Sequence, residues 1–342
     1  MSEYAPQEDP QEELQEELQE EQANEPVPES VPRGRSRKSS LVILVMVLIA
    51  ATAITISEIR GGPLPTWDEV YSALGIGADT LDRNECLAVH FIDVGQGDSI
   101  FVQAPNGKRM LIDAGENGND KKVLAYLDKY GSRKIDYVVA THPHSDHIGS
   151  LDEVINACTV HNVIMPRLSA VNTPATSVYS SLLRAVKQSK AQVISAKPGK
   201  AFTLGEAVCT VLSPSVQSEN LNNMSVVLRV EMKEKSFLFT GDAETAVEKE
   251  LMSGKYASLL DADVLKLGHH GSSTSSSAAF LKAVLPEYAV ISCGVGNDYG
   301  HPHKETMQKL GQMETTVLRT DKMGSIRIYT DGYAFMVESD NG

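Results

Sequence analysis

The sequence predicts an α/β fold in which two β-sheets pack face to face and helices cover both outer faces. Such a four-layer αββα sandwich is predicted because two blocks of strand-like segments occur, each accompanied by helix-like segments. A single transmembrane helix is predicted before the sandwich, because the run Leu41 to Ser57 contains no charged residue. At 342 residues the chain can hold one large domain and an appendage.

The N-terminal 57 residues are predicted to form a tail and a membrane anchor. Residues 1–40 hold 11 acidic and 4 basic side chains and few apolar ones, so we expect disorder; an acidic docking tail is the alternative. Residues 41–57 would span about 25 Å as a helix, the lower limit for a bilayer. The basic cluster before this run predicts a cytoplasmic N-terminus and an extracellular domain. A cleaved signal peptide and a buried core helix are the alternatives.

A stalk is predicted over residues 58–85 from its glycines, its prolines and a capping pattern. A folded domain is predicted over residues 86–342. Its first block has strand-like segments at 87–94, 99–104, 109–114, 135–142, 160–165 and 192–195, and helix-like segments at 120–130, 148–157 and 176–189. Its second block has strand-like segments at 207–212, 225–232, 235–240, 263–267, 288–292, 316–320 and 324–330, and helix-like segments at 243–252, 276–285 and 303–311.

Charge and cysteine spacing argue against two kinds of protein, a nucleic-acid binder driven by positive charge and a cysteine zinc protein. The net charge is −14, of which the tail contributes −7 (4 basic minus 11 acidic), so the rest of the chain is mildly acidic. This argues against a nucleic-acid binder driven by positive charge, but not against a hydrolase whose substrate phosphates bind metal ions. The four cysteines are widely spaced without a C-x-x-C pair, which argues against a cysteine zinc site. We expect free thiols, with a disulfide left open for an extracellular domain.

Seven of the nine histidines fall into three tight groups, at positions 142/144/147, 269/270 and 301/303. The densest group, HPHSDH at 142–147, directly follows an apolar strand-like segment. A turn at the end of a strand can aim several side chains into one cleft, because the sheet fixes their positions. Imidazole and carboxylate groups are common ligands of zinc and similar ions. The pattern therefore predicts a metal site.

Several segments resemble one known family. HPHSDH matches the H-x-H-x-D-H signature of the metallo-β-lactamase superfamily. Further segments, over roughly residues 86–330, resemble the hydrolase domain of the ComEC family of DNA-uptake channel proteins: FIDVGQGDSIFV (91–102), LIDAG (111–115), NNMSVVLRV (222–230), FLFTGDAE (237–244), LKLGHHGSSTSS (265–276) and NDYGHP (297–302). The resemblance implies the metallo-β-lactamase fold for the domain.

The resemblance also implies ligands for two divalent metal ions. They are His142, His144, Asp146, His147, Asp242, His269 and His270. His142 and His144 would bind one ion, and Asp146 and His147 would bind the other. Asp242 would be shared between the two ions. One of His269 or His270 would complete the second site; His269 is favoured, although the sequence does not separate them. Where many relatives have a further histidine, this chain has Asn222-Asn223, so coordination richer in oxygen leaves manganese and zinc both open.

Other residues are expected to support the ligands or to bind substrate. The residues expected to orient ligands by hydrogen bonding are Asp93, Gln96, Asp98, Asp113 and Asn223. The residues expected to bind a substrate anion are Ser272, Ser273, Thr274 and His301, the first three because they precede a predicted helix. The residues expected to act in catalysis are Asp146, Asp242 and His301.

The expected reaction is hydrolysis by water that two metal ions activate. The resemblance favours a phosphodiesterase or nuclease acting on DNA or nucleotides at the cell surface, tethered to the membrane by its N-terminal anchor. A hydrolase of β-lactamase or thioesterase type is the first alternative, and a non-catalytic surface binding module is the second. The sequence does not identify a protein partner.

Overall fold

The computed structural model describes residues 51–57, 62–65, 70, 81–131, 133–215 and 217–341. The chain divides into two compact units, residues 1–73 and 74–342. In the first unit residues 51–57 are helical. No helix within the described ranges combines the length and the hydropathy needed to cross a bilayer. The predicted tail, most of the predicted membrane span and much of the predicted stalk lie outside the described residues.

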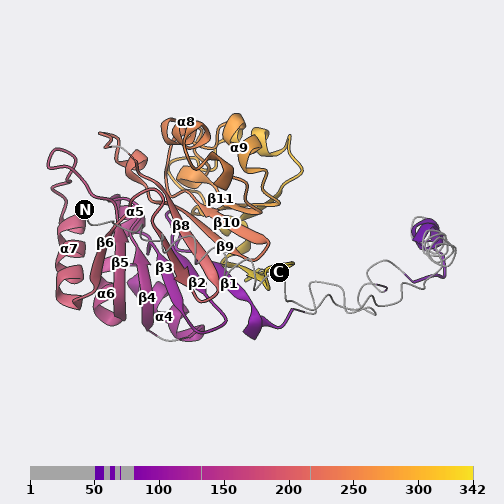
Figure 1. Cartoon of the computed structure of the whole chain (residues 1–342), viewed down its shortest axis with the longest axis horizontal. Helices are drawn as coiled ribbons and strands as arrows, with labels where there is room; N and C mark the ends of the chain where they lie inside the picture. The colour runs from indigo at the N-terminus through magenta and orange to yellow at the C-terminus, as the bar shows by residue number, and fades with distance from the viewer. Residues whose placement is uncertain are drawn as a thin grey trace, which may run out of the picture. The chain divides into compact units, whose positions relative to one another are not determined.

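The first sheet of the second unit has, among the described residues, eight strands in the order β15-β14-β1-β2-β3-β4-β5-β6. Their bounds are β1 (Leu87–Phe91), β2 (Ile100–Gln103), β3 (Arg109–Ile112), β4 (Lys134–Val139), β5 (Thr159–Met165), β6 (Gln192–Ser195), β14 (Ile326–Thr330) and β15 (Phe335–Ser339). Strands β3 to β6 are parallel, and β15, β14, β1, β2 and β3 pair antiparallel. The helices beside it are α4 (Asp120–Lys129), α6 (Leu151–Ala157) and α7 (Ser177–Ser189), seen along one side of the sheet in Figure 1.

The second sheet has seven strands in the described part of the chain, in the order β13-β12-β11-β10-β9-β8-β7. Their bounds are β7 (Ala201–Leu204), β8 (Ala207–Ser213), β9 (Val227–Met232), β10 (Lys235–Phe239), β11 (Val264–Lys266), β12 (Tyr288–Ile291) and β13 (Thr316–Arg319). Strands β10 to β13 are parallel. Helices α8 (Thr245–Ser253), α9 (Ala278–Val284) and α10 (Lys304–Leu310) accompany this sheet.

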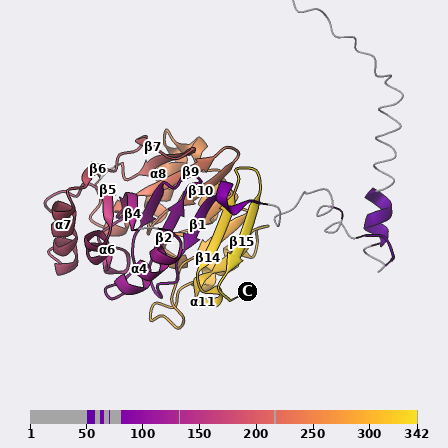
Figure 2. The same ribbon diagram turned by 90° about the horizontal axis from the view of Figure 1, so that it is seen from below.

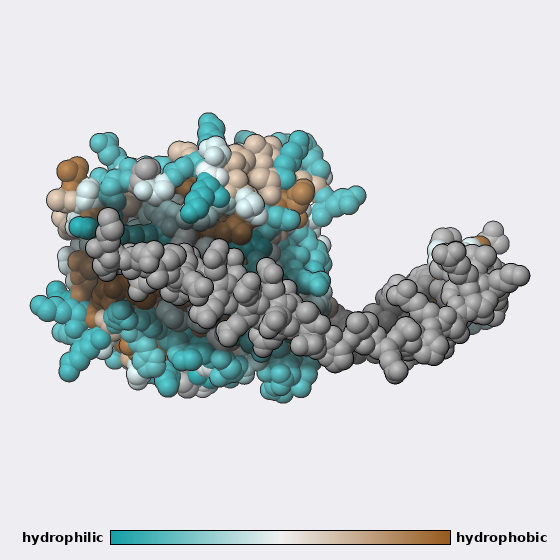
Figure 3. Space-filling model, viewed as in Figure 1, coloured by the Kyte–Doolittle hydropathy of each residue, from teal (hydrophilic) through white to brown (hydrophobic). Residues whose placement is uncertain are grey.

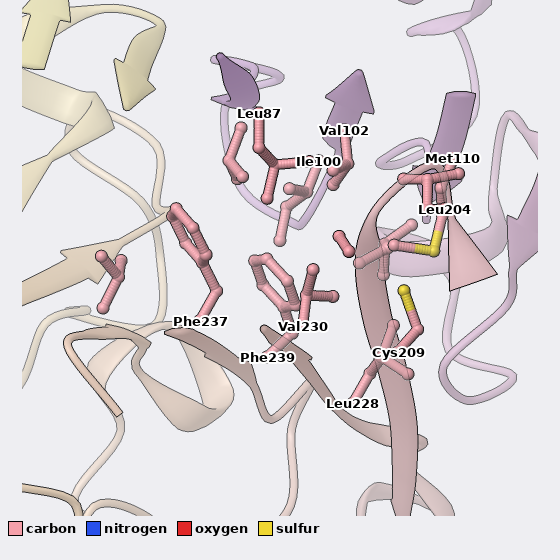
Figure 4. Packing of buried hydrophobic residues seen from close by; sticks show 14 of the residues in the cluster. Leu87, Ile100, Val102, Met110, Leu204, Cys209, Leu228, Val230, Phe237 and Phe239 are labelled. Atoms are coloured by element: carbon pink, nitrogen blue, oxygen red, sulfur yellow. The ribbon is translucent and has the colours of Figure 1, made fainter. Parts of the chain in front are cut away.

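Apolar side chains form one core between the sheets and one beneath each layer of helices. Figure 4 shows the central core, in which residues of the first sheet such as Ile100 and Val102 face Phe239 and Val230 of the second. A second cluster joins the outer face of the first sheet to α4, α6 and α7, and a third joins the second sheet to α8, α9 and α10. The predicted arrangement of two packed sheets with helices on both outer faces is confirmed, but the predicted strand 324–330 of the second block forms β14 of the first sheet, where it pairs with β1.

Three short elements differ from the prediction. Strands β7 and β15 and helix α11 (Thr320–Met323) had no counterpart in the sequence reading. Each lies at or beside a sheet edge, and β7 and β15 each bury a single residue fully. Strands that are so short and so little buried give a weak signal in sequence, because few of their residues must be apolar. Figure 2 shows β14 and β15 side by side at the C-terminal end of the chain.

One predicted helix, 148–157, begins earlier and is divided into α5 (Ser145–Ile148) and α6. Gly149 lies at the division, and a Cβ atom there would come within 2.4 Å of the backbone nitrogen of Asn117. The glycine therefore lets the loop after β3 lie directly against α5, which carries part of the HPHSDH motif.

On the face shown in Figure 3, hydrophilic residues cover much of the coloured surface.

Candidate metal centre

The carboxyl ends of β4, β10 and β11 bring three motifs into one place. The loop after β4 carries residues 142–147, the loop after β10 carries Asp242, and the turn after β11 carries His269 and His270. One ligand-type atom from each of Asp146, His147, Asp242 and His270 lies within 4.8 Å of the others. Four side chains from three loops thus converge, as the sequence predicted for metal ligands.

A second part of the cluster is formed by His142 and His144. The Nε2 atom of His142 lies 3.1 Å from Nδ1 of His144 and 3.8 Å from Oδ2 of Asp242. Nδ1 of His142 lies 3.3 Å from the hydroxyl of Ser225, which also accepts a hydrogen bond from the backbone N–H of Asp242. Because this hydroxyl occupies Nδ1, Nε2 is left for a ligand.

Asp242 stands between the two parts, with one carboxylate oxygen toward each. Its Oδ2 lies 3.8 Å from His142 Nε2 and 3.8 Å from His269 Nε2. Its Oδ1 lies 3.2 Å from His147 Nε2 and 3.6 Å from His270 Nε2. The Asp242 carboxylate therefore has imidazole nitrogens near each of its two oxygens.

Asp113 orients His147. The Asp113 carboxylate accepts from the backbone N–H and the hydroxyl of Thr141, and its Oδ2 lies 2.8 Å from Nδ1 of His147. An acceptor on Nδ1 fixes the proton there and aims Nε2 at the cluster. Ser292 does the same for His270, because its backbone carbonyl lies 2.9 Å from Nδ1 of that ring.

The two histidines of the turn after β11 differ in position. His270 is fully buried with its Nε2 3.2 Å from Asp146, whereas the His269 side chain is 24% exposed and its Nδ1 lies 3.1 Å from the hydroxyl of Thr274. Both have positive φ angles, 51° and 54°. Backbone strain of this kind persists where the surrounding structure enforces it, which is common at functional sites. The geometry places His270, rather than the favoured His269, in the group around Asp146 and His147.

Asp98 and Lys266 form a buried ion pair behind the cluster. The ammonium of Lys266, which is fully buried, lies 2.6 Å from Oδ2 of Asp98. Burial alone would raise the pKa of Asp98, but Lys266 and the imidazoles of His270 and His147 lower it to about 2. Sequence reasoning missed Lys266; its signal was a lysine between the apolar residues of the strand VLKL. A lysine in this setting is rarely buried unless it has a charged partner.

The donor set fits a divalent cation. His147 Nε2 and Asp242 Oδ1 are both buried and lie 3.2 Å apart. Burial alone would lower the pKa of His147, but neighbouring carboxylates, Asp242 first, hold it well above its usual value. Burial would likewise raise the pKa of Asp242, yet His147 and His270 hold it well below its ordinary value. Buried carboxylates that rely on imidazoles for positive charge are well suited to a metal ion.

A cavity of about 420 Å³ opens onto this cluster. Its wall includes His301 and Gln96, both predicted site residues. The Gln96 Oε1 atom lies 3.4 Å from the backbone N–H of Gly294, so its amide NH₂ faces Nδ1 of His301 at 3.4 Å. Nδ1 therefore accepts, and the proton of the neutral ring lies on Nε2. Burial, followed by the neighbouring imidazoles, lowers the pKa of His301 to about 4.

Two predicted ligand-orienting residues lie elsewhere. Asp93 accepts from the backbone N–H of Gly95 and lies 3.6 Å from the ammonium of Lys122, so it closes a turn. Asn223 accepts from the backbone N–H of Glu244, just before α8. Asp93 therefore does not support the ligands, and Asn223 acts only by fixing the loop that follows Asp242.

The predicted anion-binding serines do not line the cavity. The backbone N–H of Ser273 donates to Nδ1 of His303, and the hydroxyl of Ser272 lies 3.1 Å from that of Thr274. The predicted helix begins at Ala278, where the hydroxyl of Ser277 provides the cap. These polar groups are used inside the loop, so the structure gives them a supporting role rather than the predicted contact with substrate.

The four cysteines are free, as the spacing predicted. Three of them are buried, and burial raises the pKa of Cys209 to about 12. They lie outside the cavity wall and take no part in the centre.

Comparison with known proteins agrees with the motifs. Residues 92–295 match the metallo-beta-lactamase superfamily. The chain is 33% identical over 257 residues to ComE operon protein 3 of Bacillus subtilis, covering 70% of this chain and 32% of that protein. It is 32% identical over 292 residues to competence protein ComA of Neisseria gonorrhoeae (84% and 38%), and 29% identical over 246 residues to recombination protein 2 of Haemophilus influenzae (70% and 28%).

The chain thus spans about a third of the length of these relatives. Members of the matched superfamily are usually metal-dependent hydrolases, and the donor set described above fits that chemistry. The expected resemblance is confirmed: the chain belongs to the metallo-beta-lactamase superfamily and is related to the competence proteins of the ComEC family.

Proposed function

We propose that the chain is a metal-dependent phosphodiesterase or nuclease that hydrolyses DNA or nucleotides. The observation that carries this proposal is the convergence of donor atoms from Asp146, His147, Asp242 and His270, all within 4.8 Å of one another, at a cavity large enough for a nucleotide. The names of two relatives, a competence protein and a recombination protein, support a nucleic-acid substrate.

Two divalent ions would be held on either side of Asp242. His142 and His144 would serve the first, through Nε2 and Nδ1. The second would be held by Asp146, His147 and His270, whose donor atoms already lie together. A site with carboxylate and imidazole donors accepts both manganese and zinc, so either metal fits.

When bound, such ions would lower the pKa of a water molecule, so that hydroxide is available as the nucleophile, and would neutralise negative charge on the phosphate oxygens. The residues of the chain prepare this chemistry. Asp113 and the carbonyl of Ser292 hold the protons of His147 and His270 on Nδ1, so both Nε2 atoms remain free for ligands. His301 presents its Nε2–H as a hydrogen-bond donor for a substrate oxygen. Asp146, which lines the cavity, can orient the attacking water.

We also propose that residues 41–57 anchor the chain in the cell membrane with the N-terminus in the cytoplasm and the hydrolase outside. The uncharged run and the basic cluster before it support this orientation. Protease added to intact cells should digest the C-terminal domain. If the domain were fully protected in intact cells but digested after lysis, the hydrolase domain would lie inside the cell and the proposed orientation would be wrong.

The function is tested by offering three substrates in parallel to the full chain loaded with manganese or zinc. Single-stranded DNA and bis-p-nitrophenyl phosphate should be hydrolysed, and nitrocefin should not. Activity should vanish in His142→Ala and persist in His161→Ala, a matched variant of a histidine whose side chain is 44% exposed on β5. Turnover of nitrocefin alone would favour a β-lactamase-type hydrolase. Absence of both turnover and bound metal would favour a binding module.

A further inference from the structure

The wall of the cavity carries an aromatic side chain that the metal centre does not use. Tyr299 lines the cavity and is 62% exposed. Its ring is stacked on that of His301, with centroids 5.6 Å apart and planes inclined by 17°. The Tyr299 ring therefore lies nearly parallel to that of His301, while more than half of the residue's surface remains exposed. An exposed aromatic ring beside a catalytic cavity is a surface on which a planar group can stack.

The loop that carries Tyr299 is held in place by its own hydrogen bonds. The side-chain NH₂ of Asn297 donates to the carbonyls of Gly294 and His301, and its Oδ1 accepts from the backbone N–H of His301. Nε2 of His303 lies 3.1 Å from the carbonyl of Tyr299. These contacts fix both ends of the segment, so the ring is positioned before a ligand arrives. Positioning in advance reduces the entropy lost on binding.

The remaining wall of the cavity offers apolar contacts and few charges. Its apolar members are Pro143, Pro174, Val178 and Leu221. No lysine or arginine is present among the described residues that line it. Proteins that bind nucleic acid through the backbone phosphates rely on such cations, and the domain itself is acidic. Apart from the metal centre, the wall offers a substrate stacking, apolar contact and the neutral polar side chains of Gln96, Ser145, Thr176 and Asn222.

We infer that Tyr299 is a base-stacking residue that makes the enzyme specific for phosphodiesters bearing an unpaired nucleobase. This inference rests on the proposed function and names its substrate class, single-stranded nucleic acid. A base next to the phosphate at the metal centre stacks on the free face of Tyr299, while the apolar wall excludes water. A base inside a duplex is already stacked on its neighbours and does not offer its face to the ring.

The test compares two esters that differ only in the base. One is the p-nitrophenyl ester of thymidine 5′-monophosphate, and the other is the same ester with an abasic sugar. In the full chain loaded with metal, Tyr299→Ala should lower kcat/KM for the thymidine ester roughly 5- to 100-fold, the range for loss of one base stack. It should lower kcat/KM for the abasic ester by a clearly smaller factor, and Tyr299→Phe should resemble the wild type on both. Tyr333→Ala is the matched control, because Tyr333 is 58% exposed and lies outside the cavity wall.

An equal loss on both esters, or no loss on either, would overturn the stacking role. A binding measurement separates this failure from failure of the proposed function. Fluorescence polarisation of labelled tetrathymidylate with the full chain in EDTA should show binding that Tyr299→Ala weakens by a similar factor and Tyr333→Ala does not. Such binding without any hydrolysis by the metal-loaded wild type would refute the phosphodiesterase proposal and retain the stacking residue. Equal binding by wild type and Tyr299→Ala would refute the stacking residue alone.

Discussion

Two groups of buried acidic and imidazole side chains lie next to each other and share His147, yet their electrostatic situations differ. In one group Asp98 is paired with the ammonium of Lys266, and Asp113 accepts two hydrogen bonds from Thr141. In the other, the described ion-pair partners of Asp242 are all imidazoles, those of His142, His147, His269 and His270, and none is an ammonium. Both groups have the residue types of a metal site.

The difference shows how ligand residues can be told from supporting residues. A buried carboxylate that the protein itself neutralises is already compensated, and an added cation would meet a positive ammonium. A buried carboxylate that faces only imidazoles lacks that compensation and gains from a cation. We therefore propose that the metal ions bind at Asp242 and its neighbours, and that Asp98, Asp113 and Lys266 support them.

The largest effect is expected from removal of the shared carboxylate. Asp242→Ala should lower hydrolysis of bis-p-nitrophenyl phosphate by at least about 1,000-fold, more than the 10- to 100-fold typical when only an orienting partner is lost. Metal analysis of the purified variant should show loss of bound ions. Asp261→Ala, at an exposed aspartate, is the matched control. Retention of full activity in Asp242→Ala would contradict the assignment.

Removal of the supporting cation should act on stability. Lys266→Met leaves Asp98 charged, buried and without its ammonium partner, so the free energy of unfolding should fall by about 3–5 kcal/mol. Urea denaturation measures this loss. The double variant Asp98→Asn with Lys266→Met should recover much of it, because no unpaired charge remains. If the single variant were as stable as the wild type, the pair would not be the buried ion pair described here.

Removal of the Asp113 carboxylate, which orients His147, should have an intermediate effect on metal affinity. Asp113→Asn keeps the size of the side chain but weakens the acceptor on Nδ1 of His147, so metal affinity should fall about 10- to 100-fold. Titration with a competing chelator gives the affinity, and far-UV circular dichroism reports whether the fold is retained. An unchanged affinity would show that Asp113 does not act through His147.

The smallest effect is expected in the serine-rich loop. Ser273→Ala should change kcat/KM for a phosphodiester by less than about threefold, because this side chain does not line the cavity, and stability should change by no more than about 0.5 kcal/mol. The Ser273 hydroxyl faces His303 rather than the cavity. A loss above tenfold, specific to phosphate substrates, would restore the anion-binding role that the sequence suggested.

Much of the architecture followed from local pattern. The buried strands of both sheets and the longer helices were predicted to within a few residues, because each buries an apolar face with regular spacing. The edge strands β7 and β15 were missed because they are short and bury one residue each. The motif HPHSDH gave the position of the centre, because residues close in sequence at the end of a strand must lie together.

The supporting residues were harder to predict, since they depend on contacts between distant segments. Asp93 and Asp98 lie in the same short motif, but only Asp98 faces Lys266, which is 168 positions later in the chain. The sequence could not separate His269 from His270, because their difference comes from two consecutive left-handed backbone conformations. Such conformations result from packing of the whole loop and leave no local signature in these residue types.

The most direct test of the two-ion assignment is the crystal structure of the full chain grown with excess manganese, with anomalous differences collected above the manganese edge. The assignment predicts two anomalous peaks on opposite sides of the Asp242 carboxylate, one beside His142 and one beside His270. No peak at Asp242, or a single peak between Asp98 and Asp113, would contradict it.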